Sequence, residues 1–391
     1  MERLEELRNR LDATDRHLLE VLVQRLEIVR QVADLKADAL SFLRDSGREQ
    51  RLLDRVEEIA RELELDPYRS REIFREIIAM SLKVQEEALL NRQRRERSRL
   101  AAHRVAYQGI EGSYSHMAAR KFFAARSAGM ELVGCRSFEA ALGMAEEGEA
   151  GFAILPIENT TAGSINETYE LLRRTPLAIV GEEIFPVRHC LLAISQVEPA
   201  SLNRIISHPQ ALAQCSRFLR SLPGTEATAW GDTASAARHV SEAADPSLAA
   251  IASEEAANLY GLTVLSRDIA DQEANWTRFV IVSAPDEPPD PRIPSKTSLV
   301  LTTRHDQGAL ARVLEIVAGH GLNLCKLESR PEPSRPWEYM FYMDIEGSLA
   351  ADAVSMTIAR IRRECPYLKV LGSYPARTTG EALRDRPTEG A

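Results

Sequence analysis

The sequence predicts a multidomain protein: an all-α domain over residues 1–100, a two-lobed α/β domain over 104–285 and an α+β ferredoxin-like domain over 296–376. Leucines at helical spacing dominate the N-terminal region. Strand-like and helix-like segments then alternate, as in α/β layers, until a proline-rich segment precedes a βαββαβ pattern. We expect the polar tail, 377–391, to be disordered.

Length, charge and cysteine usage limit the classes of protein. The chain has 391 residues, enough for several hydrophobic cores, and a formal net charge of -9, which gives no overall attraction to nucleic acid or to a membrane. Its five cysteines are scattered without a CxxC pair, which favours reduced thiols over disulfides or a zinc site. We see no signal peptide at the charged N-terminus and no apolar run long enough to span a bilayer, so we expect a cytoplasmic protein.

The N-terminal region is predicted to form three helices. Leucines from Leu4 to Leu22 follow helical spacing, and the first helix should continue to about residue 40. A second helix should begin at Ser46 and a third at Pro67, a residue that suits the first helical position. A coiled-coil dimerisation arm is the simplest interpretation. The arginine-rich segment 91–104 has no aromatic residues, so we interpret it as a helix end and linker and not as a nucleic-acid site.

Charged side chains within these helices indicate a polar cavity. Arg25 and Lys36 are eleven residues apart, close to three turns, so both lie on one face of the first helix. Val29 and Val32 lie on the same stripe, where cations are costly unless they meet an anion. Arg8 lies well off this face and should serve a different surface. The other two helices add polar residues that share faces: Asp45, Arg48, Glu49, Ser81 and Gln85. These positions predict a cavity for a small dianion.

In order and spacing, these eight polar residues resemble the all-helical chorismate mutases. The resemblance implies a chorismate-binding site of Arg8, Arg25, Lys36, Asp45, Arg48, Glu49, Ser81 and Gln85. In that family two chains interlock, and one arginine of each site comes from the partner chain, the role that Arg8 matches. Lys36 and Gln85 would be catalytic, donating hydrogen bonds to the breaking ether oxygen. Glu49 and Asp45 would take the ring hydroxyl. The rearrangement needs no nucleophile, metal or cofactor.

A second polar site is predicted within the α/β domain, between Ala153 and Thr168. An apolar strand ends near Pro156 and is followed by small and polar residues: Glu158, Asn159, Thr160, Thr161 and Gly163. Ser164 is expected to begin a helix, with Glu167 at the capping-box spacing. Free N–H groups and the helix dipole would make this segment an anion-binding corner. The alternative is a purely structural strand-to-helix turn.

Other polar segments complete this pattern. Gly109–His116 lacks the GxGxxG fingerprint, which disfavours a dinucleotide site, and His116 is expected to be a structural hydrogen-bonding partner. Together the segments resemble prephenate dehydratase at Gly112–His116, Glu158–Thr160, Gly163, His189–Leu191, Ser207–Gln210 and Thr277–Phe279. The resemblance implies a two-lobed, periplasmic-binding-protein-like domain with its active site between the lobes.

In this resemblance Thr277 is the catalytic threonine, which would donate a hydrogen bond to the departing hydroxide. Glu158 or a histidine would relay the proton, and both options are open. The residues expected to bind prephenate are Ser113, Ser115, Asn159, Thr160, Ser207 and Arg278. Helix N-termini near Ser113 and Ser164 are further candidates to hold its carboxylates.

The C-terminal pattern follows a proline-rich linker, 285–294. Gly308–Leu310 and Leu327–Pro331 resemble the ACT regulatory domain that binds phenylalanine in such enzymes. The resemblance implies an effector site at an interface between two such domains, with Gly308, Ala309, Leu310, Leu327, Glu328 and Ser329. Gly308 opens a helix whose free N–H groups can meet a carboxylate. Glu328 would either take the ammonium or only orient the loop.

The resemblance covers nearly the whole chain. It implies a bifunctional chorismate mutase–prephenate dehydratase of phenylalanine biosynthesis, feedback-inhibited by L-phenylalanine. We expect a homodimer or higher homo-oligomer that acts on chorismate and prephenate without metal or cofactor and has no nucleic-acid or membrane partner. A mutase–prephenate dehydrogenase is one alternative, but it would need a dinucleotide fingerprint. A two-lobed solute sensor is another, but it would leave the mutase positions unexplained.

Overall fold

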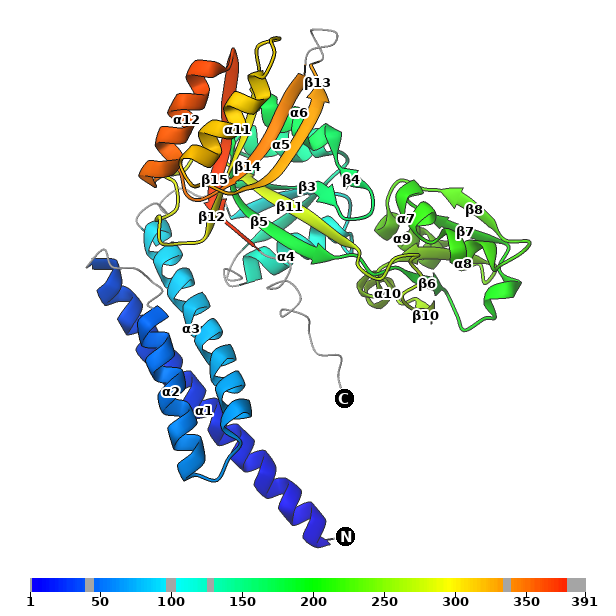
Figure 1. Ribbon diagram of the computed structural model, residues 1–391. Coiled ribbons are helices and arrows are strands. Elements are labelled where there is room, and N and C mark those ends of the chain that lie inside the picture. Colours follow the sequence, from blue (N-terminus) through cyan, green and yellow to red (C-terminus); the bar gives the residue numbers. More distant parts are fainter. Residues whose placement is uncertain (1, 39–45, 96–102, 125–129, 333–338, 378–391) are drawn as a thin grey trace. The chain divides into compact units, whose positions relative to one another are not determined.

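The computed structural model describes residues 2–38, 46–95, 103–124, 130–332 and 339–377. The chain divides into two compact units, Met1–Leu100 and Ala101–Ala391. Figure 1 labels their helices and strands. Two predictions fall outside the described residues: the role of Asp45 and the disorder of the tail from residue 378 onward.

Three helices form the N-terminal unit, as predicted: α1 (Glu2–Asp38), α2 (Ser46–Glu62) and α3 (Pro67–Arg95). α3 packs against both α1 and α2. Its Arg71 forms ion pairs with Glu57 and Asp54 of α2, which fixes one helix against the other. No helix in the described part of the chain has both the length and the apolar character that a membrane crossing requires.

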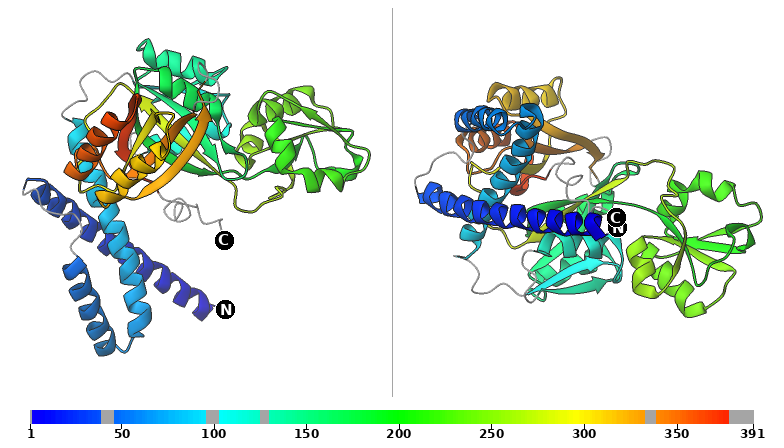
Figure 2. Two further views of the ribbon diagram at one scale, coloured as in Figure 1. Left: turned by 45° about the horizontal axis from the view of Figure 1, so that its top comes forward. Right: turned by 90° about the horizontal axis from the view of Figure 1, so that it is seen from below.

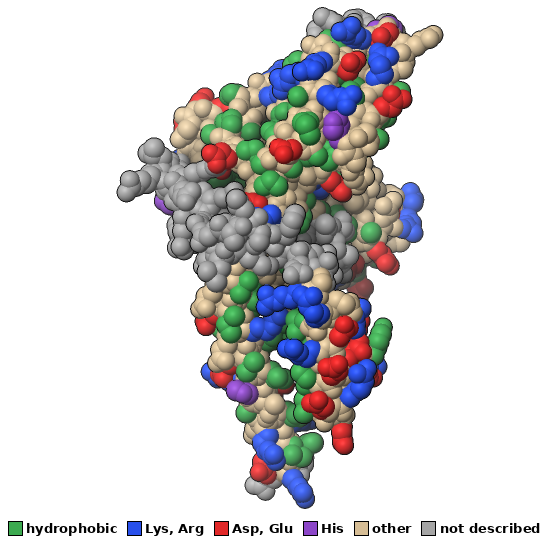
Figure 3. Space-filling model, turned by 60° about the vertical axis from the view of Figure 1, so that its left-hand side comes forward, with side chains coloured by type: hydrophobic (Ala, Val, Ile, Leu, Met, Phe, Trp, Pro, Cys, Tyr) green, Lys and Arg blue, Asp and Glu red, His purple; other side chains and the backbone are tan. Residues whose placement is uncertain are grey.

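The longest helix, α1, leaves most of its apolar side chains exposed. The exposed residues are Leu4, Leu7, Leu11, Leu18, Leu19, Val21, Val23 and Ile28. Figure 3 shows hydrophobic side chains among charged ones on the surface of this unit. An exposed apolar stripe of this length marks an interaction surface, because monomeric proteins usually bury such a stripe.

A ten-stranded sheet organises the second unit. Nine strands follow the order β13-β14-β12-β15-β5-β11-β3-β1-β2, and β4 pairs with β3. The strands of its first part are β1 (Arg104–Gln108), β2 (Glu131–Cys135), β3 (Phe152–Asn159), β4 (Gly163–Ser164), β5 (Ala178–Pro186) and β11 (Trp276–Ser283). Helices α4 (Tyr114–Phe123), α5 (Phe138–Glu146) and α6 (Asn166–Arg174) pack against them. The alternating sequence pattern predicts strands at 105–108, 131–134, 151–157, 177–180 and 279–282, which correspond to β1, β2, β3, β5 and β11, and it does not predict β4.

A separate five-stranded sheet has the order β10-β6-β9-β7-β8. Its strands are β6 (Cys190–Ala193), β7 (Arg204–Ser207), β8 (Glu226–Ala229), β9 (Leu248–Ala252) and β10 (Thr263–Ser266). Helices α7 (Pro209–Gln214), α8 (Ser216–Arg220), α9 (Thr233–Ala243) and α10 (Glu254–Tyr260) accompany them. The chain enters this part after β5 and leaves it before β11 (Figures 1 and 2). The sequence did not predict β8 and β10, which are short and only partly buried.

The C-terminal βαββαβ pattern is confirmed. Its elements are β12 (Ser295–Thr302), α11 (Ala309–Gly319), β13 (Leu324–Pro331), β14 (Tyr339–Glu346), α12 (Asp352–Glu364) and β15 (Tyr367–Pro375). We call this part, residues 295–375, the plait. α11 and α12 contact each other, and their apolar residues share a core with one face of the plait strands.

The plait continues the sheet of the preceding part. β15 runs parallel to β5, with Gly372 opposite Ile179. A Cβ atom on Gly372 would lie 2.1 Å from the carbonyl oxygen of Ile179, so this crossing requires glycine. On the second face of the plait, Met340 and Tyr342 share a hydrophobic core with Leu155 of β3. The proline-rich segment 285–294 therefore connects two parts of one compact unit.

Candidate active sites

The first site is a cavity of about 490 Å³ among the three N-terminal helices, which we call the helical cavity. Five residues of the predicted chorismate site line it: Arg25, Arg48, Glu49, Ser81 and Gln85. Its apolar wall is formed by Ile28, Val29, Val32, Leu52, Ile78 and Leu82. Polar groups from all three helices therefore converge on one concave space, a typical form of a small-molecule site.

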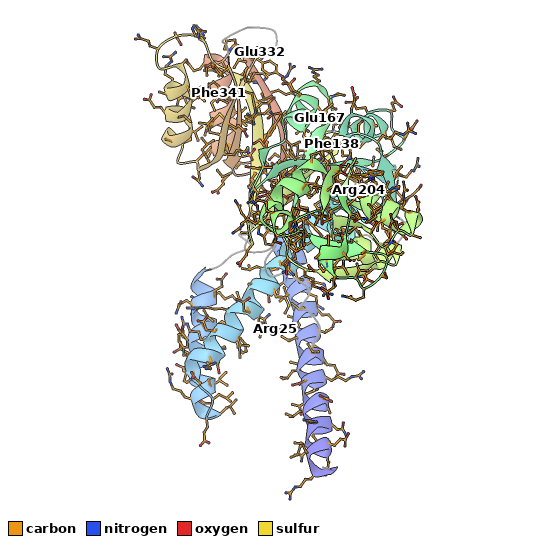
Figure 4. All side chains as sticks on the ribbon, turned by 90° about the vertical axis from the view of Figure 1, so that its right-hand side faces the viewer. Arg25, Phe138, Glu167, Arg204, Glu332 and Phe341 are labelled. Atoms are coloured by element: carbon orange, nitrogen blue, oxygen red, sulfur yellow. The ribbon has the colours of Figure 1, made fainter. Side chains whose placement is uncertain are left out.

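Arg25 is the central cation of the helical cavity and is labelled in Figure 4. Its guanidinium donates a hydrogen bond to the Ser81 hydroxyl, which in turn donates to the carbonyl oxygen of Ile77 at 2.5 Å. Burial lowers the pKa of Arg25, but an arginine remains charged at neutral pH. Ser81 thereby holds the arginine in place for an anionic ligand.

One predicted residue, Arg8, does not line this cavity. Arg8 is exposed and lies seventeen residues before Arg25 in α1, about 25 Å along a helix. Lys36 belongs to α1, but its side chain is outside the described residues. The sequence reasoning missed Arg51 and Arg55, which add positive charge to the cavity. Their spacing from Arg48 along α2 could have indicated them.

The second site is a cavity of about 430 Å³ with walls from both sheets of the second unit, which we call the sheet cavity. Ser113, Ser115, Asn159 and Thr277 of the predicted prephenate site line it. His189, His208, Gln210 and Gln214 contribute from the segment that builds the five-stranded sheet. The cavity thus lies between the two sheets, where the sequence placed it.

Thr277 and Asn159 face each other across neighbouring strands of the sheet cavity. The pairing of β11 with β3 sets Thr277 opposite Asn159. The Asn159 amide nitrogen donates to the Thr277 hydroxyl oxygen at 3.0 Å and to the Asn275 side-chain oxygen at 2.8 Å. The backbone N–H groups of Thr161 and Ala162 donate to the Asn159 side-chain oxygen, which fixes the orientation of the amide. Because Thr277 accepts from Asn159, its own proton is free to point toward a ligand.

Gln214 links this pair to His189. The Gln214 side-chain oxygen lies 2.9 Å from His189 Nε2 and accepts from the Asn275 amide at 3.1 Å. The Gln214 amide nitrogen donates to the Thr161 hydroxyl at 2.5 Å. Burial lowers the pKa of His189, so the ring is neutral and its Nε2–H donates to Gln214. His189 is therefore held as a hydrogen-bond donor within the wall.

The sheet cavity is suited to anions. Among the described residues that line it, Arg136 is the only lysine or arginine. Residues at the N-termini of five helices also line it: Ser113 to Ser115 of α4, Ser137 and Phe138 of α5, Ile165 and Glu167 of α6, His208 and Gln210 of α7, and Asp232 and Thr233 of α9. Phe138 and Glu167 are labelled in Figure 4. Helix N-termini present N–H groups and positive dipole ends, which favour carboxylate binding.

Comparison with known proteins identifies the family. A family model for type II chorismate mutase matches residues 7–86, and one for prephenate dehydratase matches residues 105–287. The bifunctional chorismate mutase/prephenate dehydratase of Enterobacter agglomerans is 36% identical over 370 residues, which make up 95% of each chain. The chain belongs to the bifunctional chorismate mutase/prephenate dehydratase family. It is an enzyme of aromatic amino acid biosynthesis with both activities.

Two solved structures resemble the dehydratase part. Prephenate dehydratase from Arthrobacter aurescens, in complex with L-Phe, is 30% identical with a TM-score of 0.63, and the match covers 74% of this chain and 93% of that one. A protein described as a novel type of quorum-quenching acylase is 34% identical with a TM-score of 0.63, over 71% of this chain and 99% of that one. The shared fold therefore extends through most of the second unit.

Four residues predicted for the dehydratase site have other surroundings in the structure. The Thr160 hydroxyl donates to the carbonyl oxygen of Ala274 at 3.1 Å, and the fully buried Ser207 hydroxyl donates to that of Ile251 at 2.6 Å. Glu158 and Arg278 do not line the sheet cavity. Glu158 precedes Asn159 on β3 and Arg278 follows Thr277 on β11, and successive side chains of a strand point to opposite faces. Both form ion pairs next to the plait.

The predicted helix start at Ser164 requires a correction. Ser164 belongs to β4, where it pairs with Glu158, and α6 begins at Asn166 without a side-chain cap. Strand pairing takes precedence over the capping box here. The Ser164 hydroxyl donates to the Glu328 carboxylate instead of capping a helix. The α6 N-terminus still reaches the sheet cavity through Ile165 and Glu167.

The predicted effector residues divide between two faces of the plait. Gly308 has a φ of +74° and precedes α11, so the helix N-terminus is placed as expected. Leu327 and Ser329 pair with Met343 and Phe341 of the helix-facing side. Glu328 lies on the other face with Ser164, Lys326 and Arg330. Glu328 therefore lies apart from Leu327 and Ser329, and both roles expected for it, taking the ammonium or orienting the loop, stay predictions.

Sequence reasoning missed Gln214 and Arg136. Gln214 ends a short helix without a recognisable motif. Arg136 precedes a helix in a segment outside the motifs that resemble prephenate dehydratase. The helix N-cap at Ser137 was the available indication for Arg136, because it places the preceding residue at a helix N-terminus.

Proposed function

We propose that the helical cavity binds chorismate and rearranges it to prephenate, and that the sheet cavity converts prephenate to phenylpyruvate. The second assignment rests on the Asn159–Thr277 hydrogen bond of 3.0 Å, in a cavity that is also lined by helix N-termini. It supplies a hydroxyl donor beside an anion-binding surface, the two features that the dehydration needs.

In the helical cavity the substrate is a dianion, so cations hold its carboxylates and donors stabilise the developing charge on the ether oxygen. Arg25 and Arg48 are placed for the carboxylates, and Gln85 for the ether oxygen. Glu49 accepts from the ring hydroxyl. Lys36 is proposed as the second donor to the ether oxygen, and Asp45 as a second partner of the hydroxyl.

Arg8 completes this site from a partner chain. Within one chain, Arg8 and Arg25 are too far apart along α1 to reach one small ligand. The exposed apolar side chains of α1 favour pairing with the helices of a second copy, because that contact would remove them from water. We therefore propose a homodimer with two mutase sites, each containing residues of both chains.

In the sheet cavity, Arg136 and the helix N-termini would hold the two carboxylates of prephenate. The ring carboxylate leaves as carbon dioxide, its bonding electrons complete the aromatic ring, and the ring C–O bond breaks to release hydroxide. Thr277 donates a hydrogen bond to the departing oxygen while it accepts from Asn159. Asn159 thus keeps the Thr277 proton directed at the leaving group. The hydroxide gains a proton and leaves as water.

Feedback inhibition by L-phenylalanine is proposed for the plait. The Arthrobacter aurescens relative was solved with L-Phe, which supports an effector of this class. The N-terminus of α11 after Gly308 offers N–H groups to its carboxylate, and Ala309, Leu310, Leu327 and Ser329 lie on the same side of the plait. β13 is an edge strand, so pairing with a second plait would enclose the effector.

Replacement of Thr277 tests the dehydratase assignment. We expect Thr277→Ala to lower the dehydratase kcat by a factor of about 100 to 1,000, because one donor to the leaving group is lost. Thr277→Ser keeps the hydroxyl and should retain most of the activity. The measurement is phenylpyruvate formation from supplied prephenate, with mutase activity on chorismate as an internal control and no NAD present. Full dehydratase turnover by Thr277→Ala would contradict the proposal.

A further inference from the structure

Neighbouring residues of β3 and β11 serve two different faces of the sheet. The strand pairing sets Thr277 opposite Asn159 and Arg278 opposite Glu158. Because successive side chains of a strand alternate between faces, the first pair lies at the sheet cavity and the second pair lies on the face toward the plait. Asn159 and Thr277 are therefore each next in sequence to a charged residue, Glu158 or Arg278, whose side chain lies on the opposite face of the sheet.

Arg278 is enclosed by acceptors from three strands. Its guanidinium lies 2.7 Å from Asp344 of β14, 2.7 Å from Glu182 of β5 and 2.9 Å from the Tyr374 hydroxyl of β15. Only 13% of the side chain is exposed. Burial by itself would raise the pKa of Asp344, but the Arg278 guanidinium lowers it, so the pair is charged. Two of these three acceptors come from the plait.

Glu158 is held by the plait in the same way. The ammonium of Lys326, on β13, lies 2.8 Å from the Glu158 carboxylate and 3.3 Å from that of Glu328. Glu328 also accepts from Ser164, which pairs with Glu158 through β4. The turn between β3 and β4, which begins at Asn159, is therefore fixed from the plait side.

Regular backbone pairing alone does not fix these side chains. The β11–β3 register shifts between Arg278 and Phe279, directly after the Arg278–Glu158 pair and one position beyond the Thr277–Asn159 pair. A bulge changes the local twist and the direction of nearby side chains. Arg278 is largely buried, and a buried charge is costly unless it is paired, so its ion pairs restrict it to one position. Lys326 holds the more exposed Glu158 carboxylate at 2.8 Å. These ion pairs hold the two side chains in place where the irregular β11–β3 pairing does not.

We propose that Lys326 and Asp344 of the plait are positioning residues of the dehydratase. They hold Glu158 and Arg278, and thereby keep Asn159 and Thr277 aligned at the sheet cavity. The inference rests on the proposed role of Thr277. It gives the plait a permanent part in the dehydratase reaction, whether or not an effector is bound.

The test uses Lys326→Met in the full chain, which removes the charge and keeps an apolar stem. We expect the dehydratase kcat to fall by a factor of about 10 to 100, with the KM for prephenate nearly unchanged, because misplacement of a catalytic group affects the chemical step. Lys326→Arg should restore most of the rate. Arg292→Met is the matched control: Arg292 is 9% exposed and pairs with Asp290, while Lys326 is 12% exposed, so both variants remove an enclosed cation.

Glu158→Gln provides a second route, because this side chain is 38% exposed and the substitution preserves its shape. If Lys326 acts through Glu158, the double variant should be no slower than Lys326→Met alone. Additive losses, or an unchanged kcat in Lys326→Met, would overturn the inference. Thr277→Ala is measured beside them. If Thr277→Ala loses dehydratase activity while Lys326→Met keeps a normal kcat, only the positioning role is rejected. If Thr277→Ala keeps full dehydratase turnover, the proposed function is rejected and this inference with it.

Discussion

Gln85 illustrates how one side chain sets the conditions under which the helical cavity can work. An amide donates a hydrogen bond at any pH, whereas a carboxyl group donates only when it is protonated. Gln85 is buried and lines the cavity with Arg25 and Ser81. If Gln85 donates to the ether oxygen as proposed, its hydrogen bond should not depend on pH, because an amide does not titrate.

We predict that Gln85→Glu makes the mutase dependent on pH. The rate should be near normal at acidic pH and fall as pH rises through the glutamate pKa, which is about 4.3 in water and higher when the group is buried. Above this range the loss should reach a factor of about 100 or more. The pH–rate profile on chorismate checks this, with Gln50→Glu at an exposed position of α2, where Gln50 donates a hydrogen bond to Asp54, as the control. A flat profile for Gln85→Glu would show that the residue does not donate in the reaction.

The site residues were predicted best where their placement depends on sequence spacing within one helix. The polar positions of three helices could be placed on common faces by helical spacing, and five of them meet in one cavity. Arg278 could not be placed in the same way. The period of a strand shows that Thr277 and Arg278 face opposite sides, but not which side is the cavity, because that depends on where the plait packs. Arg136 had no motif and was found only from the geometry.

At the scale of elements, long periodic segments and buried strands were predicted, whereas the short and poorly buried strands β4, β8 and β10 were not. α1 ends near the expected residue, and α2 and α3 begin at the expected residues, because many turns contribute to each pattern. β4 has two residues and depends on pairing with β3. Its formation replaces the helix start expected at Ser164, since a distant strand supplies hydrogen bonds that a local capping pattern cannot anticipate.

The junction between β15 and β5 is an element-level feature with a sharp test. We predict that Gly372→Ala destabilises the second unit by about 1–3 kcal/mol or more, because the new Cβ would overlap the carbonyl of Ile179. Dehydratase activity should fall with stability while mutase activity persists. Thermal unfolding checks the change, and Gly143→Ala on α5 is the matched control, since no atom lies within 4 Å of its Cβ position. Equal melting of the two variants would show that the junction tolerates a side chain.

At the scale of the whole molecule, the two units divide the work. The helical cavity belongs to Met1–Leu100 and the sheet cavity to Ala101–Ala391. Removal of the plait after residue 285 would not give a clean test of regulation, because Met340, Tyr342 and Tyr374 share a core with β3 and β5. Point variants in the full chain are therefore the appropriate probes of the plait.

The central claim is that one chain carries two separate active sites and that the first is shared between two chains. Arg8→Ala and Arg25→Ala are prepared separately and then mixed after dissociation and reassociation, and both activities are measured in each sample. We predict that either variant alone loses mutase activity. The mixture should regain about a quarter of it, because half of randomly paired dimers are mixed and each has one intact site. Dehydratase activity on supplied prephenate should be normal in all samples. A mixture that stays inactive, or a dehydratase that is lost with the mutase, would contradict the claim.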